Sequence, residues 1–85
     1  MDVPALRSLC LSLQRYAGWL DRNRASIAVR TDVQALGAAI DAGACADASA
    51  LLSSLDATIA RLPGGDVRLM MRVTAGQIRR ALDQP

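Results

Sequence analysis

Histidine, lysine, glutamate and phenylalanine are all missing from this 85-residue sequence. All ten cationic side chains are therefore Arg, and all eight anionic side chains are Asp. His, Lys and Glu supply many of the groups used in acid–base catalysis, and a structural zinc site needs a closed set of ligands that two thiols and scattered carboxylates do not provide. Cys10 and Cys45 have no base nearby in the sequence to form a thiolate at neutral pH. We expect a non-enzymatic protein with no cofactor and no metal.

Long uncharged runs are also absent. The longest stretches without a charged residue are residues 33–40 and 48–55, whereas a membrane-spanning helix needs about 20 predominantly apolar residues. The opening residues carry Asp2 where a secretory signal would carry basic residues. Two widely separated cysteines are too few for a disulfide framework. These features predict a cytoplasmic protein that does not interact with membranes.

The length sets a limit on the core. Eighty-five residues form one domain, residues 1–85, and a chain of this size buries only about 60% of the surface that its unfolded form exposes. Hydrophobic residues make up 52% of the sequence, but many of them are alanine. We therefore expect a thin core that is marginally stable alone or is stabilised by a partner.

Four segments gather their apolar side chains on one side of a helix, at spacings of three and four residues. They predict helices over residues 4–23, 32–42, 48–62 and 66–83. Short connections between them favour antiparallel neighbours. The fold class predicted is all-α, a small antiparallel bundle of four helices.

The second predicted helix has a marked start and end. Thr31 and Gln34 match a capping box, in which the two side chains satisfy backbone N–H groups at a helix start. Gly43 suits the left-handed conformation that ends many helices. The apolar segment 27–29 either begins this helix or leads into it, and the sequence does not decide between the two.

Local signals also bound the last two helices. Asp47 and Asp66 are predicted N-caps, and residues 63–65 end the third helix. Thr74 and Gln77 form another possible capping box, which would divide residues 66–83 into two short helices. The apolar arc continues through this point, which favours one unbroken helix.

Charge is segregated along the chain. Residues 1–30 carry a net charge of +3, residues 31–60 a net charge of −4, and residues 61–85 a net charge of +3. The pattern predicts that an acidic central hairpin complements the two basic flanking helices within one molecule. Alternatively, the hairpin of one copy attracts the basic helices of another and sets the register of a homo-oligomer.

The first helix has two large apolar residues outside its buried arc. Leu11 and Trp19 point to the other side, together with Arg15 and Arg22. An exposed Trp flanked by Arg is common in protein interfaces. The alternative is that residues 27–29 fold back and cover Trp19, which would then be part of the core.

A second candidate surface lies in the last helix. Met70 and Met71 have adaptable side chains, which suit a groove that accepts a partner's helix. The turn at Gly43 and Cys45 resembles the helical hairpins of small co-chaperones that hold needle subunits in type III secretion. This resemblance covers only the second and third helices, is based on leucine spacing and includes no diagnostic motif, so no family membership follows from it.

The function predicted from these surfaces is a small helical protein–protein interaction module, an adaptor, chaperone-like protein or regulatory subunit that binds a protein partner or forms a homo-oligomer. The alternative is a small DNA-binding regulator, in which the C-terminal helix contacts nucleic acid as a recognition helix. The candidate nucleic-acid-binding residues are Arg68, Arg72, Gln77, Arg79 and Arg80.

Overall fold

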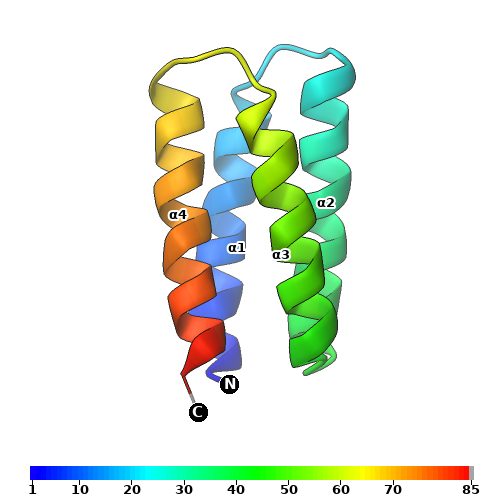
Figure 1. The fold of residues 1–85 in the computed structure, drawn as a ribbon, viewed down its shortest axis with the longest axis vertical. Helices are drawn as coiled ribbons and strands as arrows, with labels where there is room; N and C mark the ends of the chain where they lie inside the picture. Colours follow the sequence, from blue (N-terminus) through cyan, green and yellow to red (C-terminus); the bar gives the residue numbers. More distant parts are fainter. Residues whose placement is uncertain (85) are drawn as a thin grey trace.

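The computed structural model describes residues 1–84, which form four helices and no strand. The helices are α1 (Val3–Gly18), α2 (Arg24–Asp41), α3 (Cys45–Ala60) and α4 (Asp66–Asp83). Each helix runs antiparallel to the next, so both termini and the α2–α3 turn lie at one end of the molecule (Figure 1). We call this the open end, and the opposite end, with the α1–α2 and α3–α4 loops, the loop end. The predicted antiparallel four-helix bundle is confirmed.

Each helix packs against two neighbours, in the cyclic order α1, α2, α3 and α4 (Figure 1). The bundle measures 35 × 19 × 18 Å. No helix within residues 1–84 is long and apolar enough to cross a membrane.

The core is one cluster of small aliphatic side chains contributed by all four helices. Residues three and four apart on each helix face the bundle axis, as the sequence pattern predicts. The largest fully buried side chains of the core are Leu6, Leu13, Leu36, Ile40, Leu52, Leu55, Ile59, Met71 and Ile78. Two polar side chains are also buried, and both are satisfied. Ser26 bonds to Asn23, and the Thr74 hydroxyl donates to the Met70 carbonyl at 2.9 Å.

The predicted start of α2 at residue 32 is wrong, because the helix already begins at Arg24. A different capping box forms there. The Asn23 side chain accepts from the Ser26 N–H at 3.0 Å, and the Ser26 hydroxyl accepts from the Asn23 N–H at 3.0 Å. Thr31 lies inside the helix, and its hydroxyl donates to the Ile27 carbonyl. The undecided segment 27–29 is therefore the second turn of α2, and Val29 is fully buried.

Other predicted boundaries also shift by a few residues. Helix α1 ends at Gly18 rather than at residue 23, and α3 runs over Cys45–Ala60 rather than over residues 48–62. Neither Asp47 nor Asp66 is an N-cap. Both lie in the first turn of their helices, where a negative charge still interacts favourably with the helix dipole.

Two further predictions hold. Gly43 has a φ of 71° and ends α2 in the left-handed conformation, where glycine is favoured. Helix α4 runs unbroken over residues 66–83, so the possible capping box at Thr74 and Gln77 does not form. The buried arc, which continues from Met71 through Ile78 to Leu82, holds this helix in one piece.

The capping box of α2 gives a direct test of where this helix begins. We expect Asn23→Ala to lower the free energy of unfolding by about 1 kcal/mol, because it leaves the Ser26 N–H without its acceptor. Thr31→Ala is the matched control and should change stability by less than about 0.5 kcal/mol, because Thr31 caps nothing. Urea unfolding followed by circular dichroism measures both. A larger loss for Thr31→Ala than for Asn23→Ala would show that the helix begins near residue 31.

Candidate protein-binding surface

Several large apolar side chains are exposed, and most of them lie toward the loop end. Trp19 is 63% exposed, Leu69 is 61% exposed and Val73 is 53% exposed, and Met70 is also exposed. Trp19 is therefore not covered by residues 27–29. Scattered exposed apolar residues are normal in soluble proteins, whereas neighbouring ones mark an interaction surface.

On α4, three of these residues are neighbours. Met70 and Val73 are three residues apart, and Leu69 and Val73 are four apart, so their side chains lie side by side on the helix surface. Arg79 identifies the edge of α4 that faces α3, because it hydrogen-bonds to Ser53 there. Met70 is nine residues from Arg79, or about 180° around the helix, and so lies at the edge that faces α1.

Trp19 directly follows the end of α1, and its position is found from the residues of that helix. Arg7 pairs with Asp41 and so identifies the edge that faces α2. Tyr16 is about 180° from Arg7 and lies toward α4. The Trp19 ring packs edge-on against the Tyr16 ring, with centroids 5.5 Å apart.

Leu69 and Val73 lie between the two edges of α4, on its outer surface, with Leu69 about 80° from Arg79 and Val73 about 60° from Met70. Trp19, Leu69, Met70 and Val73 therefore lie on the outer surfaces of two neighbouring elements, α4 and the end of α1, toward the loop end. We call these four residues the apolar patch. Leu69 and Val73 were not among the residues predicted from the sequence to bind protein. Both fall outside the buried arc of α4, so the test that singled out Leu11 and Trp19 would have found them.

Two residues predicted to bind protein lie elsewhere. Leu11 is exposed but is eight residues before Trp19, about 12 Å along the axis, and lies beside Arg7 and Asp41 at a pocket of about 180 Å³ between α1 and α2. Leu11 and Trp19 therefore do not form one surface. Met71 is fully buried and belongs to the core, because its position on α4 faces the bundle axis.

The loop end is strongly basic. Within about two turns of the two loops, in residues 12–30 and 54–72, there are seven Arg and three Asp, a net side-chain charge of +4. The rest of the described chain has three Arg and five Asp, a net charge of −2. The seven arginines are Arg15, Arg22, Arg24, Arg30, Arg61, Arg68 and Arg72.

Five of these arginines have no partner within residues 1–84. They are exposed, and no hydrogen bond or ion pair joins them to another described residue. Asp21 and Asp66, the two acidic residues in the loops or next to them, form no ion pair either. The unpaired arginines are Arg15, Arg22, Arg24, Arg61 and Arg72.

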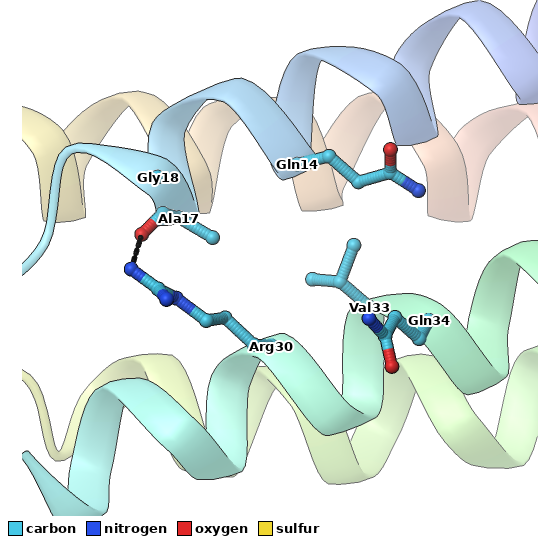
Figure 2. A pocket seen from close by; sticks show the side chains of 6 residues that line it. All are labelled: Gln14, Ala17, Gly18, Arg30, Val33 and Gln34. Carbon is cyan, nitrogen blue, oxygen red and sulfur yellow. Dashed lines mark hydrogen bonds between the residues drawn. The ribbon is translucent and has the colours of Figure 1, made fainter. Parts of the chain in front are cut away.

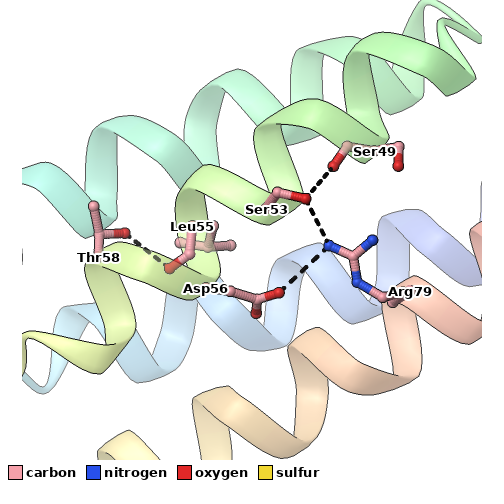
Figure 3. A network of polar contacts seen from close by, with 6 residues as sticks. All are labelled: Ser49, Ser53, Leu55, Asp56, Thr58 and Arg79. Atoms are coloured by element: carbon pink, nitrogen blue, oxygen red, sulfur yellow. Dashed lines mark hydrogen bonds and ion pairs between the residues drawn. The ribbon is translucent and has the colours of Figure 1, made fainter.

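The two ion pairs within residues 1–84 both join a flanking helix to the acidic α2–α3 hairpin. Arg7 Nε lies 2.8 Å from Asp41 Oδ1, and Arg79 Nη2 lies 3.4 Å from Asp56 Oδ2. Arg79 also donates to the Ser53 hydroxyl at 3.0 Å (Figure 3). All four side chains of the two ion pairs are partly exposed. The pairs fit the prediction that the charge segments complement one another within one molecule.

The candidate nucleic-acid-binding residues do not form one free surface. Arg68 donates to the Leu62 carbonyl, Arg79 is tied to α3, and Gln77 lies about 160° around the helix from Arg79. Arg72 and Arg80 are exposed, about 80° apart. Because α4 is continuous, the turn required before a recognition helix at Thr74 is absent.

A pocket of about 290 Å³ lies between α1 and α2, beside Gln14, Val33 and Gln34 (Figure 2). Arg30 also lines it. The Arg30 guanidinium donates to the Ala17 carbonyl at 3.1 Å and to the Leu20 carbonyl at 3.5 Å. The Ala17 carbonyl already accepts from the Leu20 N–H at 3.2 Å, so the guanidinium is a second donor there. Its positive charge interacts favourably with the dipole at the C-terminal end of α1. The role of Arg30 is therefore structural, and it fixes the end of α1 just before Trp19.

The cysteines differ in their surroundings. Burial of the Cys10 thiol raises its pKa to about 11, and the negative charge of Asp41 also raises it. Cys45 is exposed, at the start of α3. Within residues 1–84, no group of three or more His, Cys, Asp or Glu side chains could hold a metal ion.

Comparisons of the chain with protein-family models, with curated proteins and with solved structures find no match. The exposed surface of the bundle is therefore the basis for proposing a function.

The helix-capping role of Arg30 predicts a stability effect. We expect Arg30→Met to lower the free energy of unfolding by about 1–2 kcal/mol, because the Ala17 and Leu20 carbonyls lose a charged donor. Arg24→Met, on the same helix but without a partner, is the control and should cost less than about 0.5 kcal/mol. Urea unfolding measures the difference. Equal losses for the two variants would contradict the assignment.

The raised pKa of Cys10 predicts how stability depends on pH. The ordinary thiol pKa is 9.0, so between pH 9 and about 11 the unfolded chain loses this proton while the folded chain keeps it. Stability should therefore fall as pH rises through this range, by up to about 2 kcal/mol, and be unaffected by this thiol below pH 9. Urea unfolding at pH 8 and pH 10.5 measures the fall. In Cys10→Ala the fall should be smaller, and an identical fall in both proteins would contradict the prediction.

Proposed function

We propose that this chain is a non-enzymatic, helical protein-binding module, and that the apolar patch is the surface that contacts the partner. The observation that carries the proposal is the exposure of Trp19 and of three neighbouring apolar side chains of α4, on adjoining surfaces of the bundle. Trp, Met and Arg are the residue types enriched at protein interfaces, and a central Trp often contributes much of the binding energy.

The patch is not needed to complete the core. The core cluster already draws buried residues from all four helices, and none of the four patch residues belongs to it. Burying apolar surface contributes about 25 cal/mol per Å², so covering these side chains with an apolar partner surface would be favourable. The partner is another protein or a second copy of this chain. We also propose that the protein acts in the cytoplasm, because its two cysteines are free thiols.

A second candidate function is nucleic-acid binding, which the unpaired arginines of the loop end favour. It is the weaker candidate because Leu69, Met70 and Val73 would have no role against phosphates. A protein partner uses both the apolar patch and the arginines.

The test is selection from a displayed library of random peptides of about 20 residues against the immobilised chain. We expect enriched peptides to carry apolar residues at helical spacings, and their binding to shift Trp19 emission to the blue as water is excluded. Val73→Asp should weaken binding by about tenfold or more, because it places a charge in the apolar patch.

Leu11→Asp is the matched control, because Leu11 and Val73 are 54% and 53% exposed and only Val73 belongs to the patch. Both variants should fold, since both sites are on the surface, and circular dichroism confirms this. Light scattering over a range of concentrations tests the second copy: a dimer lost in Val73→Asp but kept in Leu11→Asp supports the proposal. Failure to enrich any peptide, with a monomer at all concentrations, would overturn it, as would equal losses in the two variants.

A further inference from the structure

We propose that the partner segment is an acidic amphipathic helix, with its apolar side on the patch and its carboxylates against the surrounding arginines. This inference depends on the proposed function and adds the chemistry of the partner. Its basis is the position of the apolar patch next to the arginines of the basic loop end.

Arginines surround the patch on both helices. Arg15 is four residues before Trp19 and lies on the same side of α1, and Arg22 follows in the loop. Arg72 lies near the α3-facing edge of α4, about 20° from Arg79, and borders the patch at Leu69, with which it lines a shallow pocket. These three arginines are exposed and unpaired within the described chain.

The positive charge of these three arginines favours a negatively charged partner. Exposed charges interact over about 8–10 Å at physiological salt, a distance comparable to the spacing between neighbouring helices. A partner with carboxylates beside its apolar residues gains these interactions, and Arg is suited to bind carboxylates in a bidentate manner. A partner with Lys or Arg in the same positions is repelled.

The layout of the patch favours a helix as the partner. Side chains three or four residues apart on a helix form ridges that interlock with the side chains of another helix. Two such pairs lie in the patch: Met70 with Val73, and Leu69 with Val73. Trp19 adds a broad apolar surface on the neighbouring helix. An amphipathic helix with apolar residues at positions i, i+3, i+4 and i+7 matches this surface.

Two other occupants fit less well. A nucleic acid would use the arginines, and a base could stack on Trp19, but three of the four patch residues would gain nothing. A second copy docked patch to patch would bring two loop ends of net charge +4 together, and their repulsion opposes that dimer. An acidic helix satisfies both the apolar and the charged parts of the surface.

The test compares two labelled synthetic peptides of about 20 residues by fluorescence anisotropy. Both have the same apolar side, and the positions next to it are Glu in one peptide and Lys in the other. We expect the Glu peptide to bind at least about tenfold more tightly at about 50 mM salt, and this advantage to shrink at about 300 mM. Val73→Asp should weaken binding of the Glu peptide.

A charge-matched pair of variants locates the interaction. Arg15→Gln/Arg72→Gln removes two arginines next to the patch, and we expect it to weaken the Glu peptide about threefold to tenfold. Arg24→Gln/Arg61→Gln removes the same charge from a pocket between α2 and α3 at the same end, and should change binding less than twofold. Equal losses would indicate a general charge effect and would overturn the proposed site.

The outcomes separate this inference from the proposed function. If both peptides bind equally and Val73→Asp abolishes both, the module function stands and the acidic partner is wrong. If neither peptide binds and the library selection also fails, both proposals fail. The third outcome concerns nucleic acid. If neither peptide binds, and a labelled single-stranded oligonucleotide binds in a way that depends on Arg15 and Arg72 but not on Val73, the partner is a nucleic acid and the acidic-helix proposal is wrong.

Discussion

The structure depends on the burial of one apolar stripe from each of four helices. Because the chain has no Phe and its Trp is exposed, the core consists of Leu, Ile, Val, Ala, Met and one Cys, and no single side chain fills much of it. Apolar burial is proportional to area, so a core of small side chains needs all four helices at once. Short connections set the antiparallel order, and burial of the four stripes sets the rotation of each helix and so which of its residues are exposed.

The charge layout follows from that order. The loops α1–α2 and α3–α4 are far apart in the sequence, yet the bundle brings them to the same end, and seven of the ten arginines lie near them (Figure 1). Along the sides, Arg7 and Arg79 are held by the acidic hairpin. The molecule therefore satisfies part of its charge internally and presents the rest next to its exposed apolar residues, which is the arrangement on which both proposals depend.

Prediction of the fold succeeded where periodicity was regular and failed where two local signals competed. Helix α4 has its predicted bounds because the arc from Val67 to Leu82 is unbroken. The start of α2 was misplaced because Thr31 and Gln34 match the common capping box, whereas Asn23 and Ser26 form the actual one. The buried stripe of α2 extends at spacings of three and four residues through Ser26, Val29 and Val33. Because serine is polar, a search for apolar residues at these spacings does not include Ser26.

Spacing within single helices was enough to predict that the chain is helical, that it has four helices and where most of their core-facing residues lie. It also singled out Trp19 as lying off the buried arc. Helix packing placed Trp19 next to the start of α4, separated it from Leu11 and buried Met71 while leaving Met70 exposed. The physical reason is that such a surface depends on the rotation and direction of neighbouring helices, which packing between distant segments sets.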